Sequence, residues 1–173
     1  MSQYISSADD EFMRIALIEA KEGLRNNEFP VGAVLTIDGK LFGTAHNENE
    51  SHGKYDRHAE NLVLKAHSAN IRSARKSDKK VVLYTTLEPC LMCMGAACFH
   101  RISRIVYACP AVNSGVAHVD PSLLHASGFY KKMWPEVTKN VFKNESLELL
   151  LTYMRSHPEW NETVPLMEAL QDS

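Results

Sequence analysis

Two short motifs contain residues of the types and spacing expected for a metal centre with an acid–base group. His58 and Glu60 lie in a His-Ala-Glu triplet, and Cys90 and Cys93 lie in a later Pro-Cys-Leu-Met-Cys segment. Zinc binds thiolate and imidazole in a tetrahedral shell, and a catalytic zinc keeps one position for water. The sequence therefore predicts a three-ligand zinc site formed by His58, Cys90 and Cys93, with Glu60 left free to move protons.

The chemistry of such a site is hydrolytic. Zinc lowers the pKa of a bound water to roughly 7, so that hydroxide becomes available near neutral pH. A nearby carboxylate then carries protons from the water to the substrate and to the leaving group, and Glu60 is the candidate for this shuttle. A silent zinc module that binds a partner is the alternative class. The retained Glu60 argues against it, since a scaffold needs no carboxylate beside an open zinc position.

Two further alternatives use the same residues without catalysis. One is a coincidental core histidine beside two buried thiols. The other is a closed structural zinc held by Cys90, Cys93, Cys98 and His100, which would require the chain to fold back within about ten residues. The apolar helical pattern of residues 91–100 opposes that fold-back, and Cys98 is expected to be an ordinary buried thiol.

The composition is that of a globular protein. The chain has 173 residues, of which 45% are hydrophobic and 23% charged, and we expect one domain over 1–173 with a core at about 9–156 and a tail at 157–173. No apolar run reaches the roughly 20 residues that cross a bilayer, and the N-terminus does not resemble a signal peptide. These features predict a cytoplasmic protein with reduced thiols.

The charge balance bears on the partner. The formal net charge is −2, whereas nucleic-acid binders usually show a basic balance or a basic patch. The basic residues gather at 72–80, with a smaller cluster at Lys131 and Lys132. We interpret both as a solvated loop and a helix end, with an RNA contact as the alternative.

The elements that must position the motifs follow from hydrophobic periodicity and turn signals. Helices are expected at 9–26, from about His58, at 91–100 and after a Ser146 cap, and strands at 32–37, 41–45, 81–85, 104–108 and 137–143. Residues 46–57 are expected to form a loop, and 110–128 to be irregular. The alternation predicts a three-layer α/β/α domain around a mixed sheet. Both metal motifs then fall at the starts of helices beside the sheet.

Several further segments carry a resemblance to a known family. They are Phe29–Val34, His46-Asn47, Tyr84–Cys90 and Arg101–Tyr107, together with the zinc motifs. Over about residues 10–110 the chain resembles the cytidine and deoxycytidylate deaminase superfamily, and within it the tRNA adenosine, guanine and cytosine deaminases. The resemblance implies a five-stranded sheet, zinc-dependent release of ammonia from a base, and a homodimer.

The resemblance also implies roles for residues around the zinc site. Asn47 matches an Asn that hydrogen-bonds the substrate base, and Ala59 would offer its backbone to the base edge. Phe29 stands where an apolar residue lines the pocket, and Glu88 resembles a residue that shapes it. Trp160, in the tail, is expected either to close the pocket or to pack within the tail.

The substrate is the least determined feature. The segment 109–115 lacks the lysine that the tRNA enzymes tend to carry, and 155–162 loosely resembles the tail that closes the cytosine deaminase pocket. With the acidic balance, these departures favour a free base or small nucleoside of the guanine, cytosine or adenine type. A tRNA adenosine deaminase acting at the anticodon wobble position is the alternative.

The helix at 91–100 is apolar on several faces, which favours contact with a second copy.

Overall fold

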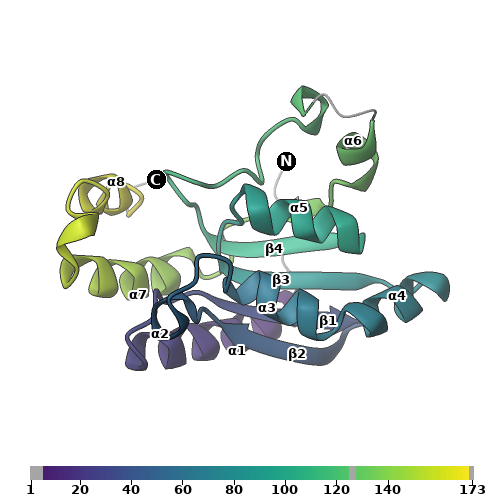
Figure 1. The fold of residues 1–173 in the computed structure, drawn as a ribbon, viewed down its shortest axis with the longest axis horizontal. Helices are drawn as coiled ribbons and strands as arrows, with labels where there is room; N and C mark the ends of the chain where they lie inside the picture. The colour runs from purple at the N-terminus through teal and green to yellow at the C-terminus, as the bar shows by residue number, and fades with distance from the viewer. Residues whose placement is uncertain (1–5, 125–127, 172–173) are drawn as a thin grey trace.

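The computed structural model describes residues 6–124 and 128–171, which fold around one five-stranded sheet (Figure 1). The strands are β1 (Gly32–Ile37), β2 (Lys40–His46), β3 (Val81–Leu87), β4 (Arg104–Cys109) and β5 (Glu136–Thr138). The helices are α1 (Ser7–Arg25), α2 (Asn49–His52), α3 (Ala59–Ala66), α4 (Ser68–Lys76), α5 (Leu91–His100), α6 (Phe129–Met133), α7 (Lys143–Arg155) and α8 (Val164–Glu168). Short 3-10 turns lie at Pro121–Leu123 and Pro158–Trp160.

The sheet is mixed, as the sequence predicts. Its order is β2-β1-β3-β4-β5, with β1 antiparallel to both of its neighbours and the β3–β4 and β4–β5 pairs parallel. All six residues of β1 are buried, and β3 and β4 are almost entirely buried as well. Strands buried on both faces require a helical layer on each side.

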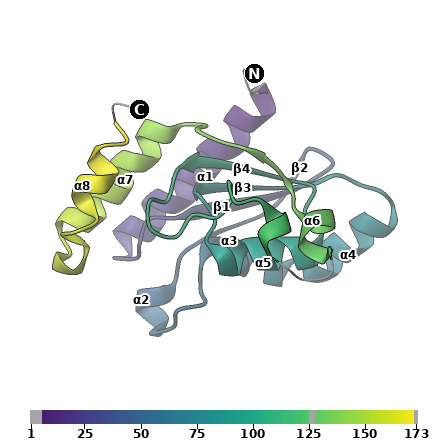
Figure 2. The ribbon, with the colours of Figure 1, turned by 90° about the horizontal axis from the view of Figure 1, so that it is seen from above.

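The two layers are visible in Figure 2, where α1 lies on one face of the sheet and α3, α4 and α5 on the other. Alternate residues of β1 divide between two cores: Val34 packs with α1, whereas Leu35 packs with α3 and α5. The expected α/β/α architecture is therefore confirmed. Among the described residues, no helix is both long and apolar enough to span a bilayer.

Helix α1 approaches β1 so closely that Gly32 has no room for a side chain. A Cβ built on Gly32 would lie 2.0 Å from the carbonyl oxygen of Ala16. The N-terminal end of α1 is fastened separately by Asp9, which is 1% exposed. Its carboxylate accepts two hydrogen bonds from Arg104 of β4, at 2.9 and 3.0 Å, and one from the Tyr84 hydroxyl of β3 at 3.2 Å. Asp9 thus ties α1 to strands β3 and β4.

We expect Asp9→Ala to lower the free energy of unfolding by about 3–5 kcal/mol, since it leaves the Arg104 charge largely buried without its partner. Burial raises the pKa of Asp9, but the hydrogen bonds from Arg104 and Ser6 outweigh burial and hold it below the ordinary value of 3.8. The stability that Asp9 contributes is therefore present above about pH 4 and is lost as pH falls through the lower folded value.

Urea unfolding of the wild type and Asp9→Ala at several pH values measures this contribution. Asp10→Ala is the matched control, because Asp10 is exposed in the same helical turn. The difference between wild type and Asp9→Ala should narrow below pH 4. A difference that stays below about 1 kcal/mol at pH 7 would contradict the assigned role.

Five sequence expectations were wrong in detail. The fifth strand ends at Thr138, because Asn140 and Phe142 adopt positive φ angles of 66° and 60°, which interrupt extended pairing. Helix α7 begins at Lys143, so Ser146 lies inside the helix and donates to the Thr86 carbonyl oxygen instead of capping. It is also not the last helix, since α8 follows it. Finally, the first part of the basic stretch 72–80 belongs to α4, and α2 lies within the expected loop.

Candidate active site

The metal motifs occupy the starts of two adjacent helices on the same face of the sheet. His58 is the residue before the first turn of α3, and Cys90 holds the same position on α5. Cys93 lies in the first turn of α5, on the same side as Cys90. Since α3 and α5 pack against each other, their N-terminal ends bring all three side chains together.

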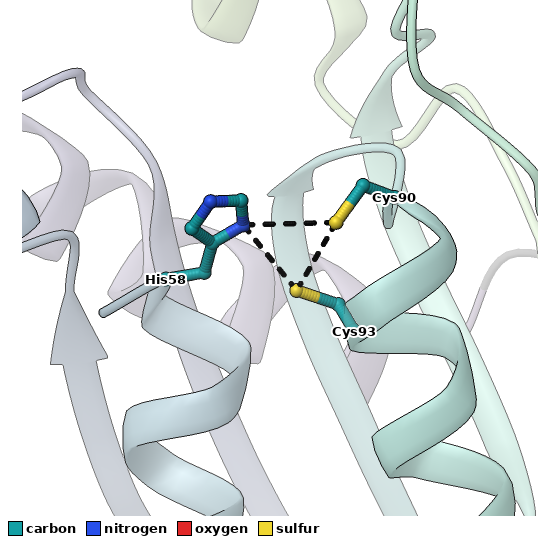
Figure 3. A group of neighbouring side chains, drawn as sticks. All are labelled: His58, Cys90 and Cys93. Atoms are coloured by element: carbon teal, nitrogen blue, oxygen red, sulfur yellow. Dashed lines mark hydrogen bonds between the residues drawn. The ribbon is translucent and has the colours of Figure 1, made fainter. Parts of the chain in front are cut away.

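Figure 3 shows the imidazole of His58 facing the two sulfur atoms, with Nδ1 as the nearest atom. Nδ1 lies 3.7 Å from the Cys90 sulfur and 3.5 Å from the Cys93 sulfur, and the sulfurs are 3.7 Å apart. Zinc bond lengths of about 2.3 Å to sulfur and 2.0 Å to nitrogen give tetrahedral edges of roughly 3.8 Å between sulfurs and 3.5 Å between nitrogen and sulfur. The donor set therefore fits zinc in both chemistry and spacing.

The electrostatics of the cluster favour a bound cation. Hydrogen bonding from Cys93, and then from His58, lowers the pKa of Cys90 to about 4 against the opposing effect of burial. The hydrogen bond to Cys90, followed by burial, raises the pKa of Cys93. Cys90 is thus the more acidic of the two thiols, and a cation bound between the sulfurs would stabilise both thiolates.

Glu60 lies beside this cluster without belonging to it. Its carboxylate is 3% exposed and accepts a hydrogen bond of 3.2 Å from the Thr85 hydroxyl of β3. The group that could hold a metal contains only His58, Cys90 and Cys93 within the described ranges. Burial raises the pKa of Glu60, because the charged form loses its hydration. A carboxyl group of this kind is suited to exchanging protons.

A pocket of about 270 Å³ opens over Glu60 and the metal cluster. Asn47, at the end of β2, is 4% exposed and lines it, and its Oδ1 accepts a 2.8 Å hydrogen bond from the amide of Ala59. The Asn47 amide nitrogen thereby stays available to a ligand. The Ala59 amide is engaged by this bond, and Ala59 itself is buried behind the pocket wall.

Aromatic rings form the opposite wall. The Phe29 ring stacks on Trp160 with centroids 4.8 Å apart and meets the edge of Tyr153 at 5.4 Å. Trp160 follows α7 in the tail, and all three residues line the pocket. The structure thus brings Phe29 and Trp160 together, as the sequence analysis allowed, and adds Tyr153.

Glu88 has a different position from the other pocket residues. It is 4% exposed, and its two oxygens accept hydrogen bonds from the amides of Ala111 (3.2 Å) and Ala117 (3.0 Å) and contact His118 Nδ1 at 3.0 Å. A Cβ on Gly115 would lie 2.3 Å from the same carboxylate. Glu88 therefore anchors the irregular segment after β4, which forms one rim of the pocket through Ser114.

We expect Glu88→Gln to destabilise the protein by about 1–3 kcal/mol, because the glutamine NH2 must face one of two amide donors. Since the displaced segment borders the pocket, KM should also rise while kcat changes less. Denaturant unfolding and steady-state kinetics measure the two effects. Glu136→Gln, at an exposed position on β5, is the control, and equal stability of the two variants would refute the anchoring role.

Further pocket residues had no signal in the sequence. They come from α2, the following loop, the segment after β4 and α7: Asn49, Glu50, Tyr55, Ser114 and Tyr153. Buried Glu28 fixes α2 by accepting hydrogen bonds from the amides of Glu50 (2.9 Å) and Ser51 (2.7 Å). These residues come from separate elements and share no sequence pattern, so only the tertiary structure reveals this wall.

The mixed sheet, the His-Cys-Cys cluster and the neighbouring buried carboxylate together define the class of zinc-dependent hydrolytic deaminases. Residues 6–109 match the family model described as the cytidine and deoxycytidylate deaminase zinc-binding region. The chain belongs to this family, and its cofactor is zinc. It is a hydrolase that cleaves a C–N bond of a cyclic amidine.

Curated relatives narrow the comparison. The chain is 32% identical to the tRNA-specific adenosine deaminase of Buchnera aphidicola over 158 residues, which are 87% of this chain and 97% of that protein. It is also 32% identical to the Bacillus subtilis enzyme of the same description over 85% of this chain and 89% of that protein. A chloroplastic tRNA(adenine(34)) deaminase of Arabidopsis thaliana is 37% identical over 129 residues, but the match spans only 9% of that long protein.

Solved structures give the same fold. One, from a study of A-to-I editing by tRNA:A34 deaminases, superposes with a TM-score of 0.65 at 30% identity, covering 81% of this chain and 99% of that chain. A guanine deaminase from Nitrosomonas europaea has a TM-score of 0.64 at 18% identity, covering 88% of this chain and 87% of that one. The latter likeness extends to the fold alone.

Proposed function

We propose that this enzyme deaminates adenosine to inosine in tRNA, at the wobble position of the anticodon. The observation that carries the proposal is the near full-length similarity to bacterial tRNA-specific adenosine deaminases. The net charge and the missing lysine in 109–115 had favoured a free base or small nucleoside over tRNA. The proposal reverses that preference. Overall charge is a weak guide, because cations concentrated on one helix can bind RNA on an acidic protein.

The chain's own residues account for the reaction. Zinc held by His58, Cys90 and Cys93 would lower the pKa of a water molecule to roughly 7. Glu60 takes one proton from the attacking water and passes it to a ring nitrogen. It then takes the second proton, from the hydroxyl now bonded to the ring carbon, and gives it to the amino group, which leaves as ammonia. Thr85 holds the Glu60 carboxylate in place throughout. One residue thus serves as base and then as acid.

Other residues bind the base. The Asn47 amide nitrogen is the donor available to a ring acceptor, since its Oδ1 is held by the Ala59 amide. Phe29 presents an apolar wall and excludes water from the reacting carbon, and Trp160 supports the Phe29 ring from the tail. We assign Ala59 to holding Asn47 and Glu88 to holding the rim, so both act through neighbours.

The test is inosine formation and ammonia release from a substrate panel. The panel holds an anticodon stem-loop with a wobble adenosine, the same stem-loop with guanosine at that position, and free adenosine, guanine and cytosine. The wild type should convert the stem-loop with the wobble adenosine to inosine, and Glu60→Gln is the inactive control. Conversion of guanine or cytosine, with no inosine in the stem-loop, would overturn the proposal.

A small-base deaminase is the second candidate, favoured by the stacking of Trp160 on Phe29 at the wall of a pocket of only about 270 Å³. In that case small bases in the panel are the best substrates and turnover depends little on salt. RNA turnover, in contrast, should weaken steeply with salt, because phosphate neutralisation releases counterions.

We also propose a homodimer formed through the first turn of α5. Leu91 and Met92, in this turn, are 57% and 41% exposed. Burying such side chains stabilises an interface at about 25 cal/mol per Å² of apolar area. Light scattering at micromolar concentration should give twice the chain mass, with Leu91→Glu/Met92→Glu monomeric. A monomeric wild type would contradict the dimer.

The remaining assignments concern the whole chain. We propose that residues 1–173 form a single deaminase domain, since the described elements share one sheet and contiguous cores. The tail contributes Trp160 to the pocket and is part of this domain. A cytoplasmic location stays a prediction.

A further inference from the structure

A cleft of about 700 Å³ lies at the far end of α5 from the metal cluster. It is lined by residues of α4 and of the end of α5: Ser68, Ile71, Arg72, Arg75, Lys76, Phe99, His100 and Arg101. The lining contains four cationic side chains of arginine and lysine and no acidic residue. Such a concentration of one sign contrasts with the net charge of −2 for the chain.

Helix α4 holds its cations on one face. Arg72, Arg75 and Lys76 are three and four residues apart, so they project to the same side of the helix. Arg72 and Lys76 are exposed. Arg75 is fixed instead, since it donates to the Ser103 hydroxyl at 3.2 Å, and its Nε is buried without a hydrogen-bond partner among the described residues.

His100 makes two hydrogen-bond contacts at the cleft. His100 Nδ1 is 2.8 Å from the Ala96 carbonyl oxygen, so this nitrogen carries the proton and donates. In the neutral ring Nε2 can then accept from the Ser68 hydroxyl, 3.2 Å away. The contact with Ser68 joins the end of α5 to the start of α4.

The aromatic ring at the rim indicates the kind of anion. Phe99 is 69% exposed, although one edge packs on Phe129 of α6 with centroids 5.0 Å apart. Surfaces that bind nucleic acid strands typically place cations along the phosphate backbone, next to an aromatic ring on which a base can stack. This cleft combines four cationic side chains with an exposed aromatic ring, which a surface carrying cations alone does not.

We propose that this cleft binds phosphates of the RNA substrate that lie away from the reacting base. Helix α5 has ten residues, so its two ends are about 15 Å apart. Figures 1 and 2 place α4 at one end of the molecule and α2, which lines the pocket, toward the other. A stacked strand advances about 3.4 Å per nucleotide, so phosphates four or five nucleotides from the pocket reach the cleft. The inference rests on the proposed RNA substrate and names a second contact with it.

The test compares two double variants that each remove two charges. Arg72→Gln/Lys76→Gln neutralises the cleft at exposed positions and leaves the Arg75–Ser103 bond intact. Lys21→Gln/Arg25→Gln neutralises two exposed positions on α1, on the opposite face of the sheet. Stem-loop affinity is measured by fluorescence anisotropy from 50 to 200 mM salt, together with kcat and KM.

The cleft variant should show a shallower dependence of log affinity on log salt, by about 1.4–1.8 for two lost phosphate contacts. The KM of the cleft variant should rise about ten-fold or more with kcat unchanged. The salt dependence, KM and kcat of the α1 variant should equal those of wild type. If wild type converts the stem-loop and the cleft variant keeps its slope and KM, the cleft proposal is overturned while the proposed function stands. If wild type does not convert the stem-loop at all, the proposed function is wrong, and the cleft proposal that rests on it is wrong as well.

Discussion

Glu60→Gln is expected to lower kcat by about 10²–10⁴-fold, the usual contribution of general acid–base catalysis. The amide keeps the size of the carboxylate and can still accept the hydrogen bond from Thr85. It cannot take up and release the proton that the reaction transfers. KM should change little, since Asn47 and Phe29 are untouched.

Zinc content separates this effect from loss of the metal. Glu60→Gln should retain about one zinc per chain, measured by elemental analysis of the purified protein. Thr85→Val, which removes only the group that holds the carboxylate, should have a smaller effect on kcat. Glu11→Gln, at an exposed position on α1, serves as the control. Full activity of Glu60→Gln would exclude Glu60 from the proton transfers.

Cys93→Ala is expected to abolish zinc binding and with it nearly all activity. Two ligands, His58 and Cys90, then remain of the tetrahedral set. A ligand that binds only the folded state stabilises it by about 4 kcal/mol at 1,000 times its dissociation constant. The variant should therefore also unfold at lower temperature than the zinc-bound wild type.

Cys98→Ala is the matched control, because Cys98 is buried in the same helix but stands outside the metal cluster. It should keep its zinc and respond to a chelator as wild type does. The melting temperature of Cys93→Ala should be insensitive to chelator. Zinc at one equivalent in Cys93→Ala would mean that another residue completes the site.

The sequence predicted the centre of the site because its information is local. Cys90 and Cys93 are three residues apart, so helix geometry places both sulfurs on one side of α5, and the short His58-Ala59-Glu60 triplet keeps the carboxylate near the histidine. The strands β1, β3 and β4 were equally visible as apolar runs between turn signals. Tertiary packing then had only to bring two helix starts together.

The remainder depended on information that hydrophobic patterns do not carry. The positive φ angles of Asn140 and Phe142 end the fifth strand early. Asparagine adopts such angles more readily than most residues, but phenylalanine does not, so hydrophobic periodicity gave no sign of the break. Asn49 and Tyr153 reach the pocket from distant elements. The basic stretch 72–80 was visible in the sequence, but the structure was needed to show that Arg72, Arg75 and Lys76 share one face of α4 and line one cleft.

The contacts of Asp9 have a consequence for the order of folding. The bond between Asp9 and Arg104 spans 95 residues, whereas His58 and Cys93 are 35 apart. Closing the longer loop sacrifices more chain entropy, so contacts of high sequence separation tend to form late. The strands and helices around the zinc ligands can thus assemble before the bond between Asp9 and Arg104 forms. A chain that lacks the Asp9 bond would then fold at nearly the normal rate and lose its native state faster, through a higher unfolding rate.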